Sequence, residues 1–102
     1  MNQEVGVARN IRSVEWLKAE LAGGAGTVCK ALLKGNPEAV ADSLAGLVVS
    51  CYLLGRRVGL DYGRLDEAIG VKLELNVRSG HELETWYGDL SQLRDHLRGR
   101  RR

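Results

Sequence analysis

The sequence has 102 residues, of which 44% are apolar and 27% are charged, with a formal net charge of only +2. This length and composition indicate one soluble globular domain with a modest core. They exclude a protein with a wholly basic face, because the basic character is local: five arginines fall within the last nine residues, namely Arg94, Arg98, Arg100, Arg101 and Arg102.

The N-terminal residues 1–9 are predicted to form a flexible arm. They contain no apolar segment of the kind found in a signal peptide. Cys29 and Cys51 lack the spacing of a zinc or redox motif, so we expect them to be reduced and buried. The longest uncharged run, Ser43 to Gly55, is shorter than the ~20 apolar residues that span a bilayer. We therefore expect a cytoplasmic protein with no membrane partner.

A first helical pattern runs from Asn10 to Lys34 and is interrupted by Gly23, Gly24 and Gly26. Each glycine costs roughly 1 kcal/mol relative to alanine inside a helix. The apolar phase continues through them, which predicts one long helix, weakened or kinked near Gly23 and Gly24. Two helices with a short break are the alternative. The glycines indicate close packing of another helix or a ligand, or else have no special role.

The stretch from Asn36 to Val58 predicts a second helix with both ends marked. Asn36 can cap the N-terminus and Pro37 suits the first helical position. Arg56 and Arg57 lie in the last turn, and Gly59 follows as a left-handed stop. The short link at residues 34–36 makes this helix antiparallel to the first. Because its apolar residues nearly surround the axis, we expect it to be buried on all sides and shared with a second copy.

The remaining chain predicts a third helix from Tyr62 to Arg78, an ambiguous stretch at residues 81–88, and a short last helix that starts with a capping box at residues 89–92. No strand-like alternation is present. The predicted fold is therefore all-α: a bundle of about four helices around a central antiparallel hairpin, assembled as a homodimer or tetramer. The helical domain is expected over residues 10–98, followed by a basic tail at residues 99–102.

Several strings resemble a known family. They are Lys-Ala-Leu-Leu-Lys-Gly at residues 30–35, Pro-Glu-x-x-x-Asp at residues 37–42, Leu-Leu-Gly-Arg-Arg-x-Gly-Leu-Asp at residues 53–61, and His-Glu-Leu-Glu-Thr-Trp-Tyr-Gly-Asp-Leu-Ser at residues 81–91. Over roughly residues 11–98 the chain resembles the MazG nucleotide pyrophosphohydrolases, and most of all the small stand-alone MazG-like proteins of bacteria. This resemblance implies an all-α protein whose helix-borne carboxylates hold Mg²⁺ and cleave nucleoside triphosphates to monophosphate and pyrophosphate.

The chain departs from the carboxylate pattern that the resemblance implies. The family carries Glu-Glu-x-x-Glu on its first helix, where Gly23, Gly24 and Thr27 stand here. Of the Glu-x-x-Asp on its second helix, only Asp42 is retained, because Ala39 occupies the glutamate position. Glu38 is one residue away, which turns it by about 100° around the helix. Asp42 and Glu38 are thus the candidate metal ligands, and no catalytic residue is assigned.

Other acids do not obviously complete this site within one chain. The hairpin pairs Asp42 with Cys29, and Glu20 is then about 13 Å further along at ~1.5 Å per residue. A partner chain could supply Glu20, Asp66 or Glu67. Asp42 is otherwise a relic or a polar contact in a dimer.

Three residues near the end of the third helix are candidate phosphate ligands. Lys72 and Asn76 are four residues apart and share a helix face, with Arg78 near the same end. They resemble the Lys, Asn and Arg that the family places against nucleotide phosphates. The alternative is that Lys72 and Arg78 are solvated surface charges.

The functional prediction is a MazG-like protein of the pyrophosphohydrolase superfamily, dependent on Mg²⁺ if it is active. The alternative is a catalytically reduced structural or regulatory module that binds nucleotide or oligomerises. Trp16, Trp86 and Tyr87 could stack on a base, but core or interface positions are the commoner role for such residues. A third, weaker alternative is nucleic-acid binding by the arginine tail, although a solvated tail is the preferred interpretation.

Overall fold

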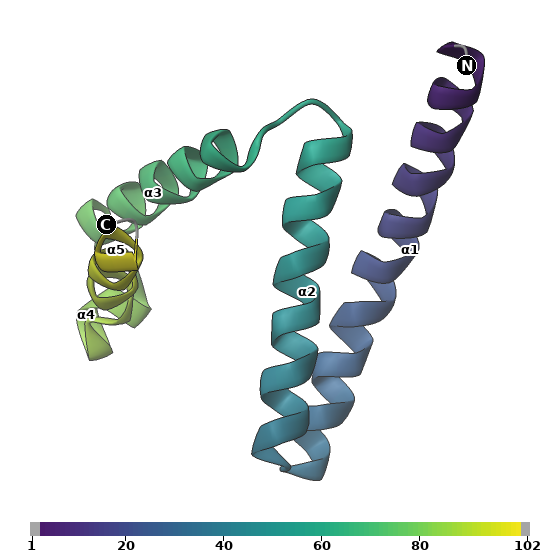
Figure 1. The fold of residues 1–102 in the computed structure, drawn as a ribbon. Coiled ribbons are helices and arrows are strands. Elements are labelled where there is room, and N and C mark those ends of the chain that lie inside the picture. Colours follow the sequence, from purple (N-terminus) through teal and green to yellow (C-terminus); the bar gives the residue numbers. More distant parts are fainter. Residues whose placement is uncertain (1–2, 101–102) are drawn as a thin grey trace. The chain divides into compact units, whose positions relative to one another are not determined.

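The computed structural model describes residues 3–100, which form five α-helices and contain no strand. These are α1 (Gln3–Lys34), α2 (Pro37–Arg57), α3 (Tyr62–Arg78), α4 (Glu82–Tyr87) and α5 (Asp89–Arg100), shown in Figure 1. The predicted all-α class is confirmed, with five helices where about four were expected. The chain divides into two compact units, Met1–Tyr62 and Gly63–Arg102.

Helix α1 begins at Gln3 and continues without a break to Lys34. The prediction of a helix start at Asn10 is therefore wrong, since the described residues before Asn10 extend the same helix. The alternative of two helices is also wrong, because the helix passes through Gly23, Gly24 and Gly26. The neighbouring α2 supports this part of α1 through side-chain packing.

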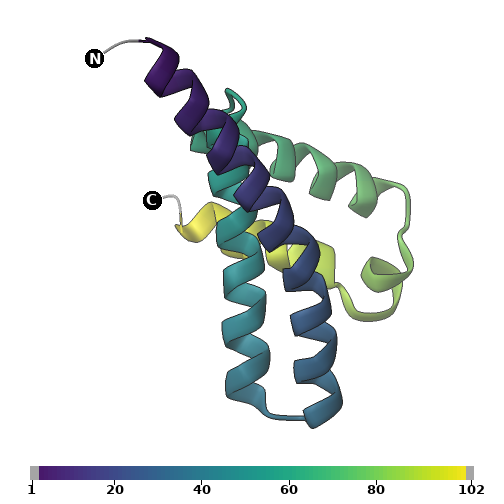
Figure 2. The same cartoon turned by 90° about the vertical axis from the view of Figure 1, so that its right-hand side faces the viewer.

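A tight turn joins α1 to α2 and makes them an antiparallel hairpin, as predicted (Figures 1 and 2). Gly35 adopts a left-handed φ of 71°, and its N–H donates to the Ala31 carbonyl at 3.1 Å. The Asn36 side chain accepts hydrogen bonds from the N–H groups of Glu38 at 3.0 Å and Ala39 at 3.3 Å. This is the predicted N-cap, with Pro37 at the first helical position.

The register of the hairpin is set by the approach of Leu47 to Gly24. A β-carbon on Gly24 would lie 3.1 Å from Leu47 Cδ1, whereas Gly23 and Gly26 have open space at the same position. Close helix packing therefore explains Gly24 alone among the three glycines. Because residue 24 of α1 is level with residue 47 of α2, residue 29 is level with Asp42 along the hairpin, the pairing that the sequence predicted.

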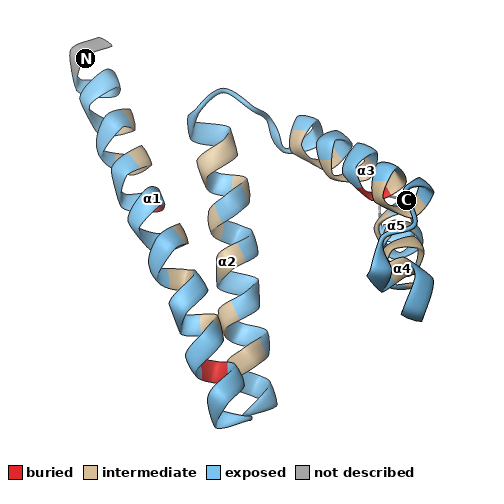
Figure 3. Cartoon of the chain, turned by 180° about the vertical axis from the view of Figure 1, so that it is seen from behind, coloured by how far each residue is buried: buried red, intermediate tan, exposed pale blue. Residues whose placement is uncertain are grey.

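The hairpin leaves most of its apolar surface exposed in the single chain (Figure 3). In α1, Leu17 and Ala31 are buried, but α2 contains no buried residue, and Val48 is 53% exposed. The prediction that this helix is buried on all sides is wrong for one chain, because α1 covers only one of its faces. Cys29 and Cys51 are free but exposed, so their predicted burial is also wrong.

By length and composition, α2 is the one helix among residues 3–100 that could cross a membrane. The sequence prediction considered only the uncharged run inside it. Central helices of soluble helical proteins have the same composition, so this property does not identify a membrane protein. The absence of a membrane partner stays a prediction.

Helices α2 and α3 end in the same way. After α2, the N–H of Leu60 donates to the Gly55 carbonyl at 2.9 Å and that of Gly59 to the Arg56 carbonyl at 3.3 Å. This pair of bonds is a Schellman motif, and Gly59 supplies its left-handed residue with φ of 103°. Gly80 has the equivalent position after α3, with φ of 72°.

In the second unit, α3 has the predicted bounds and Leu73 is its buried residue. The ambiguous stretch contains a separate short helix, α4, which ends at left-handed Gly88. The predicted capping box before α5 is wrong, because Glu84 of α4 takes that role. Its carboxylate accepts from the Ser91 N–H at 2.8 Å and from Ser91 Oγ at 2.7 Å.

Gly99 and Arg100, which were predicted to belong to a basic tail, are part of α5. Arg101 and Arg102 lie outside the described residues.

Candidate functional site

The two candidate metal ligands lie in the first turns of α2. Glu38 follows Pro37 in the first turn, and Asp42 is one turn further along the helix. Both side chains are exposed. Since the N-terminus of a helix carries partial positive charge, Glu38 has a structural role there whether or not it binds an ion.

The opposite side of the hairpin supplies no acid near Asp42. Cys29 is at the facing register position, and Thr27 one half-turn away donates its hydroxyl to the Gly23 carbonyl at 3.1 Å. Within the described part of the chain, no group of three or more His, Cys, Asp or Glu side chains could hold a metal ion. Mg²⁺ prefers six oxygen ligands at about 2.1 Å. The residues of one chain therefore do not fit the Mg²⁺ site that the sequence resemblance implies.

The three candidate phosphate ligands all lie on α3 but differ in their surroundings. Lys72 is exposed and Asn76 is half-buried, whereas Arg78 forms an ion pair with Glu74, one turn earlier, at 3.9 Å. Arg78 also lines a pocket of about 550 Å³ that neither Lys72 nor Asn76 reaches. Of the predicted set, Arg78 is therefore the residue that lines this pocket.

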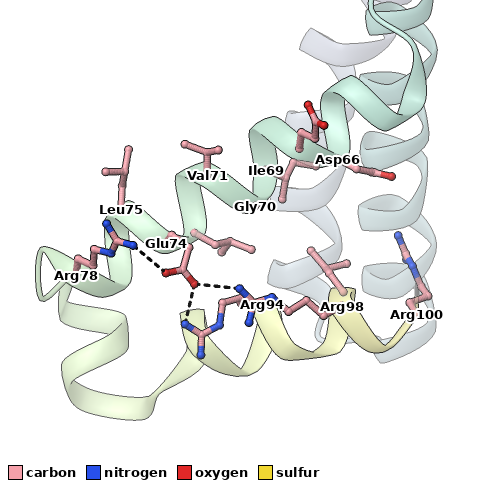
Figure 4. Close-up of a pocket in the computed structure, with 13 residues that line it drawn as sticks. Asp66, Ile69, Gly70, Val71, Glu74, Leu75, Arg78, Arg94, Arg98 and Arg100 are labelled. Atoms are coloured by element: carbon pink, nitrogen blue, oxygen red, sulfur yellow. Dashed lines mark hydrogen bonds and ion pairs between the residues drawn. The ribbon is translucent and has the colours of Figure 1, made fainter. Parts of the chain in front are cut away.

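Glu74 organises that pocket (Figure 4). Its Oε1 accepts from Arg94 Nη1 at 2.9 Å and from Arg98 Nη2 at 3.5 Å, so one carboxylate joins α3 to α5. The hydrogen bond to Glu74, followed by the one to Asp95, raises the pKa of the Arg94 guanidinium. Two of the five C-terminal arginines are thus engaged by acids of their own unit, and Asp66 and Glu67 lie on the same pocket wall.

A second pocket, of about 580 Å³, lies on the hairpin away from Asp42. We call it the arginine–aromatic pocket; it is lined by Arg12, Trp16 and Leu17 of α1, Leu53, Arg56 and Arg57 of α2, with Ser13 and Tyr62. Its α1 wall is tied to the end of α2, because Asn10 Nδ2 donates to the Arg57 carbonyl at 3.3 Å. The ring of Tyr62 packs against that of Tyr52, with centroids 6.3 Å apart.

The comparison with known families agrees with the hairpin and the helices that follow it. The sequence model of the MazG-like family matches residues 7–90, which is most of the chain. The chain belongs to the MazG-like family. Neither the curated proteins nor the solved structures contain a match.

The arginine–aromatic pocket of this MazG-like protein is not among the sites predicted from its sequence. The sequence nevertheless contains two indications of this pocket. Arg12 and Trp16 are four residues apart and share a face of α1, and Arg56 and Arg57 mark the end of α2. What the sequence does not contain is the Schellman turn geometry that brings Tyr62 back beside Tyr52.

Proposed function

We propose that this MazG-like protein is a catalytically reduced member of its superfamily, which binds nucleotide and self-assembles but does not hydrolyse nucleoside triphosphates by itself. Its family membership supports the nucleotide pyrophosphohydrolase ancestry. The proposed loss of catalytic activity concerns the carboxylates of this chain.

One observation carries the proposal. The contact between Gly24 and Leu47 sets the hairpin register, and in that register Cys29, not an acid, is the residue of α1 that is level with Asp42. Cleavage of a phosphoanhydride assisted by Mg²⁺ needs ligands that fix the ion and stabilise the developing charge. One exposed aspartate provides neither the number nor the geometry of ligands for this task.

Self-assembly is supported by the face of α2 that α1 leaves uncovered. Leu44 and Val48 are each about half exposed, and because they are four residues apart they share one face of the helix. Exposed apolar residues grouped in this way mark interaction surfaces in soluble proteins. A homodimer or tetramer would cover them with the same residues of a second copy.

The second candidate function is an active pyrophosphohydrolase whose site is completed by a partner chain. Asp66 and Glu67 lie on one pocket wall in the second unit, so they could act together. Glu20 is exposed on α1 and is available to another copy. In this alternative Asp42 would share Mg²⁺ with acids from the partner.

Nucleic-acid binding by the tail receives less support. Glu74 already engages Arg94 and Arg98, which leaves fewer free cations for phosphates.

The experiment is a pyrophosphate-release assay on the full chain with Mg²⁺ and a panel of nucleoside triphosphates. We expect no release above the background of buffer with Mg²⁺. Release that disappears in Asp42→Ala, but survives in the matched exposed variant Glu15→Ala, would contradict the proposal and establish the active enzyme. Adding Glu20→Ala or Asp66→Ala would then identify the acid that completes the site.

A further inference from the structure

We infer that the arginine–aromatic pocket binds a nucleoside polyphosphate without a metal ion, at a place separate from Asp42. The ligand class rests on the proposed nucleotide-binding function. The location of the site is inferred from the residues that line the pocket. Arg56 lies about 21 Å from Asp42 along the axis of α2 at ~1.5 Å per residue, so one small ligand does not touch both.

The charge of the pocket selects an anion. Arg12, Arg56 and Arg57 line it, and no acidic residue does. Among the described residues none of these three arginines forms an ion pair. The pocket on α3 and α5 differs, because Glu74 engages three of its arginines. Guanidinium groups bind phosphate oxygens through paired N–H donors, so three arginines suit a chain of phosphates.

The aromatic side chains that line the rest of the pocket favour a ligand that contains an aromatic ring. Trp16 is 60% exposed and Tyr62 is 49% exposed, and both line the pocket beside buried Leu17. Exposed aromatic faces stack on nucleobases of any sequence, and this stacking is strongest where cations lie nearby. An inorganic anion would leave this surface in water. A base covers it while the phosphates reach the arginines.

The volume of the pocket is consistent with such a ligand. About 580 Å³ is within the range of small-molecule sites, roughly 300–1,000 Å³. Its walls come from α1, α2 and Tyr62, the first residue of α3. The Asn10–Arg57 hydrogen bond joins α1 to the end of α2, and the Tyr52–Tyr62 ring contact holds Tyr62 beside α2. The site is therefore formed before the ligand arrives.

The test is isothermal titration of the full chain in EDTA with three probes: adenosine triphosphate, inorganic tripolyphosphate and adenosine. We expect adenosine triphosphate to bind at least about tenfold more tightly than either of the other two, because only it uses both walls. Arg56→Ala combined with Arg57→Ala, and separately Trp16→Ala, should each weaken its binding by at least about tenfold. Trp16→Phe keeps a stacking face and should retain most of the affinity.

Lys30→Ala is the matched control, since Lys30 is an exposed cation of α1 outside the pocket. It should leave the affinity unchanged, and circular dichroism should show the same helix content for every variant. Three results would each overturn the inference: no binding of adenosine triphosphate, equal binding of tripolyphosphate, or affinity unaffected by the arginine and Trp16 substitutions.

Repeating the titration with Asp42→Ala separates this inference from the proposed function. Binding here needs neither Asp42 nor Mg²⁺, whereas the proposed loss of hydrolysis is judged by pyrophosphate release.

Discussion

Leu47 of α2 approaches the backbone of Gly24 so closely that a β-carbon at Gly24 would lie 3.1 Å from its Cδ1 atom. Few real β-carbons have a contact this short. Gly24 occupies one of the positions where the resemblance expects a metal-binding acid. Here the same position lets an aliphatic side chain of the neighbouring helix approach the backbone of α1. At this point of the hairpin the glycine therefore serves close helix packing.

The first prediction compares neighbouring glycines. Gly23→Ala should raise the free energy of unfolding by about 0.5–1 kcal/mol, because alanine favours the helix and its β-carbon meets open space. Gly24→Ala should gain less, since Leu47 must move by a few tenths of an ångström. Urea denaturation followed by circular dichroism measures both. Equal stabilisation by the two substitutions would mean that the Gly24–Leu47 contact does not constrain the hairpin.

The sequence predicted those features of the fold that depend on neighbouring residues. The Asn36 cap, the left-handed glycines and the bounds of α3 all follow from residues within one or two turns. The helical pattern of apolar residues predicts the start of α1 at Asn10, which is too late. Val5 and Val7 are two residues apart and do not extend that helical pattern toward the N-terminus. The local pattern places the cap of α5 at Asp89, but the structure places it at Glu84 of α4. Local sequence rules do not predict that a carboxylate from the preceding helix will cap the next one.

The site was predictable only in part for a similar reason. The loss of acids at residues 23, 24, 27 and 39 can be read directly from the sequence. The grouping of Lys72, Asn76 and Arg78 stays a prediction, and the structure adds that Arg78 pairs with Glu74, one turn earlier on α3. The arginine–aromatic pocket joins residues from distant parts of the chain, and such a combination becomes visible only once the hairpin register is known.

The second prediction concerns the start of α2. Asn36→Ala should lower the free energy of unfolding by about 1 kcal/mol, because the N–H groups of Glu38 and Ala39 lose their acceptor. Asn36→Gly is the control, with an expected loss of only a few tenths of a kcal/mol. Thermal unfolding of the two variants checks the difference. If both lose the same amount, the side chain does not act as a cap.

The third prediction concerns Glu84 and acid. The hydrogen bonds from Ser91, first from its hydroxyl and then from its N–H, lower the pKa of the Glu84 carboxyl below its ordinary value. A carboxyl whose pKa is lower in the folded state stabilises that state above its unfolded pKa and loses this effect as the pH falls. We expect Glu84→Gln to lower the melting temperature at pH 7. The difference from wild type should shrink as the pH falls below the ordinary Glu pKa of about 4.3.

Glu82→Gln is the matched control for this experiment, because it removes a carboxylate from the same short helix and is exposed. It should change the melting temperature less than Glu84→Gln at pH 7. A pH-independent difference between wild type and Glu84→Gln would show that the charge of Glu84 plays no part in capping α5.

The fourth prediction ranks Arg94 and Arg98, the two arginines of α5 that pair with Glu74. Arg94 lies 2.9 Å from Glu74 with 23% of its side chain exposed, whereas Arg98 lies at 3.5 Å with 64% exposed. Exposed ion pairs contribute little to stability because water and salt screen them. Arg94→Ala should therefore lower the melting temperature more than Arg98→Ala at the same salt concentration. The opposite order would mean that the pair with Arg98 is the one joining α3 to α5.

The fifth prediction tests self-assembly. Val48 is 53% exposed on the uncovered face of α2, and a charge there would have to be buried if a second copy covers it. Val48→Glu should therefore convert the wild-type dimer or tetramer into a monomer at micromolar concentration, as measured by light scattering after size-exclusion chromatography.

Val71→Glu is the control for that experiment, because Val71 is 61% exposed on α3 and receives the same substitution. It should keep the wild-type mass. A monomeric wild-type protein would contradict self-assembly directly. If Val48→Glu and Val71→Glu both keep the wild-type mass, the protein assembles through another surface, and the apolar face of α2 stays open to a different partner.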